Sequence, residues 1–243
     1  MTRSGRECRL DARIVTTTAT PRGELRSRRL RRFSSVQFLV AITTLFVSMP
    51  FIEPLRAGPL VESILFTVVL VSGVVTIGDR QRVIITAGGL AVATVASRWL
   101  QHFRPDIISR AVFLVGGILF VLFVIIHLLR FVLAASEVDM EVLCASISAY
   151  LLLGLLWTFA YWLIAELVPN AFAFNGTDKS LGGFNGFYFS FITMCTVGYG
   201  DITPVAKVAR MLAAMEAMTG LLYVAVLIAR LVAIQATPKA HES

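Results

Sequence analysis

The stretch that decides the fold is Thr196-Val197-Gly198-Tyr199-Gly200-Asp201, and it lies between two long apolar runs. Gly198 and Gly200 adopt a positive φ at no steric cost, whereas the residues with side chains beside them do not. Alternation of these two kinds of residue lets successive carbonyl groups point toward one axis. Four such strands around an axis would form stacked rings of oxygen atoms, and the Thr196 hydroxyl would add a ring at the inner end. Such rings can replace the water around a dehydrated monovalent cation.

The composition is that of a membrane protein. Of the 243 residues, 57% are hydrophobic and 15% are charged, and the mean hydropathy is +0.79, whereas soluble domains carry about 25% charged residues. We therefore exclude a soluble enzyme. Cys8, Cys144 and Cys195 are far apart, which predicts neither a disulfide framework nor a zinc site. We expect no enzymatic activity and no cofactor.

The positive charge is concentrated in residues 1–32, which contain ten Arg and three acidic residues. The rest of the chain is neutral, so the net charge of +7 indicates no nucleic-acid partner. Basic residues favour the cytoplasmic side of a membrane, so we expect a protein of the cell membrane with a cytoplasmic N-terminus. The Arg cluster can also bind anionic lipid, at about 1 kcal/mol per residue. A topology signal explains the same residues and is the interpretation that we favour.

Six apolar runs have a length near the roughly 20 residues that a membrane-spanning helix requires. They cover residues 35–52, 61–78, 83–100, 109–133, 142–168 and 205–235. Six spans return the C-terminus to the cytoplasmic side. Between the last two runs, residues 169–204 are rich in glycine and include an aromatic run at 186–195 that is too short to cross a bilayer. This run is predicted to be a re-entrant helix, because irregular backbone at membrane depth needs protein or a water-filled cavity around it.

Residues 142–235 resemble the pore domain of the potassium channel superfamily, which consists of an outer helix, a pore helix, a selectivity filter and an inner helix. The resemblance depends on the string at 196–201 and on its place between two spanning helices. It implies an all-α membrane protein with six transmembrane helices, a re-entrant pore helix and an extended filter, assembled as a homotetramer. It also implies that K+ is the permeant ion. The residues that would bind K+ are Thr196, Val197, Gly198, Tyr199 and Gly200.

The rest of the chain divides into three parts. Residues 1–34 are expected to form an Arg-rich, disordered cytoplasmic tail, and residues 236–243 a short cytoplasmic tail. Residues 35–135 are expected to form a four-helix bundle that resembles a voltage-sensor domain without its charges. Its last span has Arg110 and then no basic residue until His127, whereas steep voltage dependence needs several charges that cross the field. A lone histidine on an apolar helix is usually a packed residue, so pH sensing is not expected either.

The pore helix is expected to run from Gly186 to about Cys195, with Asn185 as its N-cap. In the family this helix points its partially negative C-terminal end at the ion pathway. Many relatives place two Trp on it that hydrogen-bond the filter tyrosine and the following aspartate. Here those positions are Tyr188 and Phe189. Tyr188 can still donate to Asp201, but Phe189 has no donor for the filter tyrosine.

Two glutamates lie in the spans on either side of the filter. In voltage-gated relatives, a glutamate at the position of Glu166 bonds backbone near the start of the inner helix, here Val205-Ala206. The alternative for Glu166 is a carboxylate that reaches the membrane interface. Glu216 needs a partner or a proton if it is buried. Its position suggests the back of the filter, although the sequence names no partner for it.

The inner helix carries a glycine where relatives often have a hinge. Gly220 lies twenty residues beyond Gly200, and the alternative to a hinge is a glycine that only permits close helix packing. On the same spacing, one hydrophobic face would line the inner pore and close it by dewetting. Its residues are Leu221, Val224, Ile228 and Val232.

These features predict passive, potassium-selective conduction without strong voltage gating. Two alternatives stay open: a modulatory subunit of a hetero-oligomeric channel, and a less selective monovalent cation channel. Channel-derived uptake transporters carry four pore repeats with degraded filters in one chain, which argues against that class. The sequon Asn175-Gly176-Thr177 lies in the predicted outer loop, where a turn is a simpler explanation than glycosylation.

Overall fold

The computed structural model describes residues 21–52, 57–76, 81–103, 110–135, 137–176 and 180–236. Within these ranges the chain is almost entirely helical, as predicted, apart from one short strand pair. The elements in chain order are α1 (Pro21–Ile52), α2 (Gly58–Thr76), α3 (Gln81–Phe103), α4 (Arg110–Ala134), α5 (Met140–Leu167), β1 (Phe172–Phe174), α6 (Phe184–Met194), β2 (Ile202–Pro204) and α7 (Lys207–Ala236).

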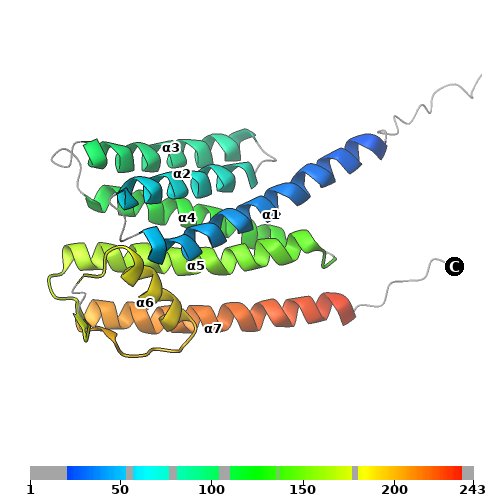
Figure 1. Ribbon diagram of the computed structural model, residues 1–243. Coiled ribbons are helices and arrows are strands. Elements are labelled where there is room, and N and C mark those ends of the chain that lie inside the picture. Colours follow the sequence, from blue (N-terminus) through cyan, green and yellow to red (C-terminus); the bar gives the residue numbers. More distant parts are fainter. Residues whose placement is uncertain are drawn as a thin grey trace, which may run out of the picture.

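The helices lie in layers that end at α7 (Figure 1). Helices α2 and α3 form one side, and α1 and α4 lie between them and α5. Helix α7 lies on the opposite side of α5, and α6 contacts α5, α7 and α1. The buried apolar residues form one continuous core that extends from Phe38 on α1 to Ala209 on α7. The first four helices, which include the predicted bundle over residues 35–135, therefore share their core with the C-terminal helices.

Four of the described helices are long and apolar enough to cross a membrane. Their apolar parts are Ser35–Ile52, Arg110–Ala134, Met140–Leu167 and Lys207–Ile234. The apolar parts of α2 and α3 are shorter, at Leu60–Val75 and Ile85–Leu100. The chain is thus a helical membrane protein, and the predicted total of six spans rests on α2 and α3 crossing as well.

Helix α1 begins at Pro21, so the expectation of a disordered tail over residues 1–34 is wrong for residues 21–34. Proline is favoured at the first position of a helix because its missing N–H has no partner there. The Arg and Leu residues that follow are strong helix formers, which explains why the helix continues beyond the apolar run. Residues 1–20 and 237–243 lie outside the described part of the chain.

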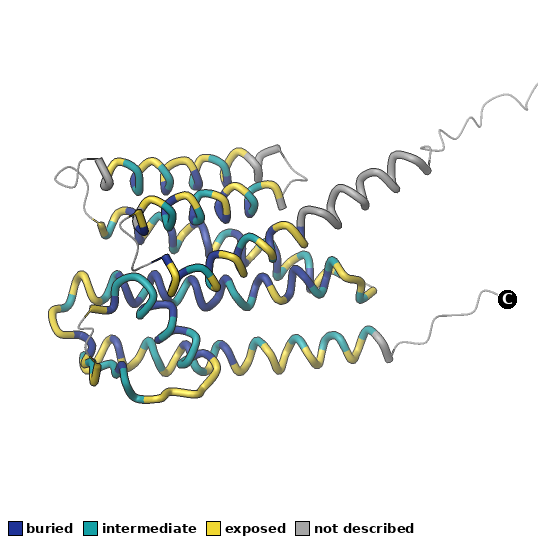
Figure 2. The backbone as a smooth tube through the Cα atoms, viewed as in Figure 1, coloured by how far each residue is buried: buried dark blue, intermediate teal, exposed yellow. Residues whose placement is uncertain are grey.

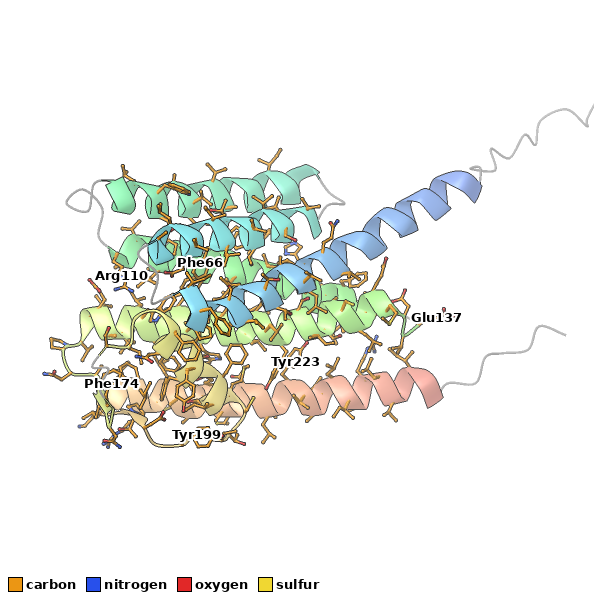
Figure 3. All side chains as sticks on the ribbon, viewed as in Figure 1. Phe66, Arg110, Glu137, Phe174, Tyr199 and Tyr223 are labelled. Carbon is orange, nitrogen blue, oxygen red and sulfur yellow. The ribbon has the colours of Figure 1, made fainter. Side chains whose placement is uncertain are left out.

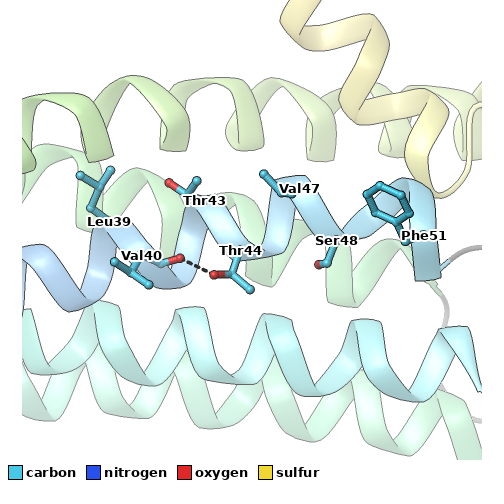
Figure 4. A pocket seen from close by; sticks show the side chains of 7 residues that line it. All are labelled: Leu39, Val40, Thr43, Thr44, Val47, Ser48 and Phe51. Carbon is cyan, nitrogen blue, oxygen red and sulfur yellow. Dashed lines mark hydrogen bonds between the residues drawn. The ribbon is translucent and has the colours of Figure 1, made fainter.

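The outward face of α1 carries a shallow groove made by residues of this helix (Figure 4). Its lining residues are Leu39, Val40, Thr43, Thr44, Val47, Ser48 and Phe51. The Thr44 hydroxyl donates to the Val40 carbonyl at 2.8 Å, and the Ser48 hydroxyl to the Leu45 carbonyl at 3.0 Å. Because these hydroxyls bond their own helix, the face is suited to an apolar environment such as lipid.

Helix α7 is much less covered than α5 (Figure 2). In their most apolar stretches, 6% of the residues of α7 are buried, against 67% of those of α5. A single chain therefore leaves an apolar helix of 30 residues largely uncovered, and lipid or further chains must cover it in a membrane.

Candidate functional site

The short helix α6 packs against both α5 and α7 (Figure 1), and it approaches a glycine of each of these helices closely. A Cβ at Gly154 of α5 would lie 2.5 Å from the Phe191 ring, and a Cβ at Gly220 of α7 would lie 2.5 Å from the Met194 carbonyl oxygen. Real side chains do not approach so closely. The close approach at Gly220 favours the packing interpretation of this residue over the hinge, and α7 is a continuous helix there.

The N-terminus of α6 differs from the prediction. The helix begins at Phe184, and its N-cap is Gly183 with a φ of 58° and no side-chain cap. Asn185 is already inside the first turn, where its Nδ2 donates to the Ser180 carbonyl at 2.9 Å. The prediction of Asn185 as the N-cap is wrong, because the left-handed φ of Gly183 starts the helix earlier than the polar residue suggested.

The C-terminus of α6 turns directly into the predicted filter. Cys195 is the C-cap, the Thr196 amide donates to the Thr193 carbonyl at 2.9 Å, and the Val197 amide donates to the Ile192 carbonyl at 2.8 Å. These are the two hydrogen bonds of a Schellman motif, which requires a left-handed residue just after the C-cap. That residue is Thr196, with a φ of 59°.

Beyond α6, the backbone alternates between left-handed and right-handed conformations. Thr196, Gly198 and Gly200 have φ values of 59°, 50° and 81°. We expected left-handed conformations at the two glycines only, so Thr196 corrects that expectation. A non-glycine residue pays about 1–2 kcal/mol to be left-handed, and the helix end imposes this conformation on Thr196.

The predicted filter residues are open to their surroundings in a single chain. Residues 195–199 are exposed, and the Tyr199 side chain, at 73% exposure, extends away from the helices at the edge of the molecule (Figure 3). No atom lies within 4 Å of a Cβ built at Gly198 or Gly200. Within one chain these glycines are therefore required by their φ angles and not by lack of space.

A strand pair holds the outer end of this segment. Strands β1 and β2 are antiparallel, with Phe174 opposite Ile202. Beside them, Asn175 Nδ2 donates to the Gly200 carbonyl at 3.0 Å, and the Asn175 amide donates to the Asp201 carbonyl at 2.8 Å. Sequence reasoning missed this role of Asn175, for which the only signal was its place in the outer loop.

The predicted contact between Tyr188 and Asp201 is present. The Tyr188 hydroxyl hydrogen-bonds the Asp201 carboxylate, and this bond is the main cause that lowers the pKa of Asp201 below its usual value. Phe189 instead faces the core, where its ring centroid lies 4.9 Å from that of Tyr161 and 5.4 Å from that of Phe172. It makes no contribution at the filter.

The two glutamates are placed very differently. Glu166 is exposed, and the amides of Val205 and Ala206 donate to the Ala171 carbonyl at 2.8 Å and 3.2 Å. The predicted tie from Glu166 to this backbone is therefore wrong, because the chain supplies a carbonyl acceptor there. Glu216 is completely buried and contacts α6 from behind, on the side that the sequence suggested.

The four residues of α7 that were predicted to line the inner pore are exposed in a single chain. Leu221, Val224, Ile228 and Val232 are 65%, 40%, 56% and 59% exposed, which leaves them free to line a shared pathway.

Near the C-terminal end of α7, Arg230 Nη2 donates to the carbonyls of Leu133, at 2.5 Å, and Ala135, at 3.2 Å. Arg230 therefore ties the inner helix to the end of α4, a contact that sequence reasoning missed.

Helix α4 carries no array of charges. His127 Nδ1 lies 2.9 Å from the Phe123 carbonyl, and its ring centroid lies 4.3 Å from that of Phe123, so this histidine packs within its own helix. An ion pair lies elsewhere among the first four helices, between α2 and α3. Arg98 of α3 pairs with Glu62 of α2 at 3.3 Å, a pair that sequence reasoning did not identify.

Comparisons with known proteins find similarity to ion channels. Residues 147–235 match the family model described as "Ion channel". The chain is 35% identical over 77 residues to the inward rectifier potassium channel Kirbac3.1 of Paramagnetospirillum magnetotacticum, which covers 32% of this chain and 24% of that protein. It is 34% identical over 88 residues to two-pore potassium channel 3 of Arabidopsis thaliana, which covers 36% of this chain and 18% of that protein.

The family match is confined to the C-terminal part of the chain. The chain spans about a quarter or less of the length of the two curated relatives that it matches. No solved structure matches it. The match covers the outer helix α5, the short helix α6, the segment with alternating hand and the inner helix α7. Residues 147–235 therefore match the ion channel family, and the similarity to two potassium channels supports a pore domain of the potassium channel superfamily.

Proposed function

We propose that this chain is a potassium-selective channel that conducts K+ passively as a homotetramer. The observation that carries the proposal is the left-handed backbone at Thr196, Gly198 and Gly200, directly after a helix whose C-terminal end leads into it. This alternation turns successive carbonyl groups the same way, and residues 196–200 supply the oxygen ligands. The similarity to two potassium channels supports K+ as the ion.

Four chains are needed because one strand contributes a single oxygen atom to each ring. The exposed residues at 195–199 and the uncovered apolar helix α7 support such an assembly, since both need cover that one chain does not provide. The partially negative C-terminal ends of four α6 helices would then favour a cation at the inner end of the filter.

The proposed placement in the cell membrane has six spans and both termini in the cytoplasm. The Arg-rich N-terminal region supports this orientation, because basic residues are retained on the cytoplasmic side. The uncharged middle of α4 supports a pore without strong voltage dependence. A modulatory subunit of a hetero-oligomeric channel is the alternative that shares all of these features.

The proposal is tested by ion flux from liposomes that contain the purified protein. We expect K+ and Rb+ to pass, Na+ to be excluded and external Ba2+ to block. Gly198→Ala should abolish flux without loss of assembly, because a left-handed alanine costs about 1–2 kcal/mol in each of four chains. Gly89→Ala is the matched control, since a Cβ at Gly89 meets no atom within 4 Å and flux should persist.

The same preparation separates the alternatives. Native mass measurement is expected to give four identical chains. Equal Na+ and K+ flux would replace the selective channel by a less selective one. Absence of flux from a well-folded protein, with flux restored by a second channel chain that co-purifies with it, would identify a modulatory subunit.

A further inference from the structure

Glu216 is a buried acidic residue that joins three helices behind the predicted filter. It lies on α7, and its side chain is fully buried. The Tyr161 hydroxyl of α5 donates to its Oε2 at 2.5 Å. The Ser190 hydroxyl of α6 lies 2.5 Å from its Oε1. Both distances lie at the short end of the range of O–H···O hydrogen bonds.

A count of hydrogen atoms decides the state of this carboxyl group. The Ser190 oxygen also lies 2.8 Å from the Gly154 carbonyl oxygen, which can only accept. A hydroxyl group has one hydrogen atom, so Ser190 cannot donate both to Gly154 and to Glu216. If Glu216 carries a proton on Oε1, it donates to Ser190, Ser190 donates to Gly154, and Tyr161 donates to Oε2. Every polar atom in the cluster is then satisfied.

An ionised carboxylate would leave one of these contacts without a hydrogen atom. It would also place a full charge among apolar side chains at membrane depth, which costs several kcal/mol without a cationic partner. The described groups that touch the carboxyl are hydroxyl groups and carry no positive charge.

The cluster is placed where it can control the filter. Ser190 lies two and three residues before Ile192 and Thr193, whose carbonyls accept the hydrogen bonds that set the left-handed turn at Thr196. On α7, Gly220 contacts the Met194 carbonyl one turn beyond Glu216. A displacement of α6 relative to α7 would therefore move the first filter residue.

We propose that Glu216 is a neutral carboxylic acid that positions the pore helix α6 between α5 and α7, and that the ion selectivity of the filter depends on it. This inference rests on the proposed channel function. Glu216 acts through Ser190 and Tyr161 and touches no ion, so it is a positioning residue and not a filter ligand.

The inference is tested by three substitutions compared in the liposome assay. Glu216→Gln keeps one donor for Ser190 and one acceptor for Tyr161, so the ratio of K+ to Na+ flux should stay within about twofold of the wild type. Glu216→Met keeps the volume but no hydrogen bond, and the ratio should fall about tenfold, as expected for loss of a buried hydrogen bond. Glu137→Gln, at an exposed loop position, is the matched control and should change nothing.

Ser190→Ala provides a test that does not depend on the folding of the Met variant. It removes the acceptor of the Glu216 proton and should lower the flux ratio. Ser190→Ala and Glu216→Met should together cost less than the sum of their separate effects, because both break the same chain of hydrogen bonds. Additive effects would overturn the proposed connection.

Infrared difference spectra between wild type and Glu216→Gln give a readout independent of conduction. We expect the wild type to show the carbonyl band of a protonated carboxylic acid that the variant lacks, and a carboxylate band instead would overturn the neutral state. Glu216→Gln as damaging as Glu216→Met would overturn it too. If the wild type does not discriminate K+ from Na+, the channel proposal fails while this spectrum still decides the state of Glu216. If the wild type is selective and Glu216→Met equally so, only the positioning role fails.

Discussion

Thr196 occupies a backbone position where most proteins place glycine. Its φ of 59° is imposed by the two hydrogen bonds that close the end of α6, and glycine would adopt it without strain. A threonine at this position bears about 1–2 kcal/mol of strain that a glycine would not. The proposed use of its hydroxyl group is the innermost ring of ion ligands.

Thr196→Gly should therefore separate stability from selectivity. Relief of strain is expected to leave the protein as stable as the wild type or up to about 1 kcal/mol more stable, while the ratio of K+ to Na+ flux falls because the hydroxyl ring is lost. Thermal unfolding in detergent and liposome flux measure the two effects. Thr196→Ser keeps the hydroxyl and should preserve selectivity. Clear destabilisation by the glycine would contradict the strain argument.

One hydrogen bond, between Tyr188 and Asp201, predicts a pH dependence at the outer end of the predicted filter. Because the Tyr188 hydroxyl lowers the pKa of Asp201, the ionised carboxylate contributes stability that is fully present above the usual pKa of an aspartate. This contribution is lost as the pH falls through the lowered value. Tyr188→Phe removes the hydroxyl, so the pKa rises toward its usual value and the acid loss occurs at a less acidic pH.

The measurement for this prediction is K+ flux against external pH for wild type, Tyr188→Phe and Asp201→Asn. The Asn variant has no titratable group at this position and should lose this part of the pH dependence. A midpoint for Tyr188→Phe that equals the wild-type midpoint, or lies below it, would show that the hydrogen bond does not control Asp201.

Among the elements, the short helix α6 depends most on the size of its neighbours. Glycines on α5 and α7 allow the bulky Phe191 and Met194 side chains of α6 to lie against backbone. Local sequence makes α6 a helix, but these close contacts determine its position. Small residues have this role wherever membrane helices approach closely.

Gly154→Ala should displace α6, because the new methyl group would lie 2.5 Å from the Phe191 ring. Overpacking of this kind costs about 1–3 kcal/mol. Gly89→Ala in α3 has open space and should stabilise its helix by up to about 1 kcal/mol, since alanine is the better helix former. Thermal unfolding in detergent measures both. Equal effects of the two substitutions would show that α6 is not tightly seated on α5.

At the scale of the whole molecule, the N-terminal helices α1 and α2 pack against α5 and α6. Phe66 of α2 packs against Phe159 of α5 and Phe187 of α6, with ring centroids 5.8 Å and 6.3 Å apart. Phe46 of α1 meets Phe187 and Phe191 at 5.3 Å and 4.7 Å. These contacts join helices from both halves of the chain, so α1 and α2 support α6.

Arg230 joins the C-terminal end of α7 to the end of α4. Arg230→Gln should release the inner helix from the carbonyls of Leu133 and Ala135, at a cost of about 1.5–3 kcal/mol for hydrogen bonds from a charged group. We expect a lower unfolding temperature and altered open probability in single-channel recordings. Lys207→Gln, an exposed position at the start of α7, is the control. Unchanged stability and gating in Arg230→Gln would show that α4 and α7 are not coupled there.

The sequence predicted well what depends on neighbouring residues. The string at 196–201 indicated the turn of alternating hand, because the φ preferences of glycine are local, and apolar runs indicated the helices. The predictions that proved wrong also concerned local structure. Asn185 resembled a cap but lies within the first turn of α6, and the Arg-rich stretch that we expected to be disordered is helical from Pro21.

The tertiary structure decided which distant residues meet. Glu216 reaches Tyr161 and Ser190 across 55 and 26 residues of chain, and Asn175 reaches Gly200 across 25. Arg230 reaches the end of α4 across 97. The order of residues encodes backbone preference and burial, but hydrogen-bond partners depend on the depth, rotation and separation of packed helices. Those quantities follow from the fit of Gly154 and Gly220 to their neighbours, which no short stretch of sequence contains.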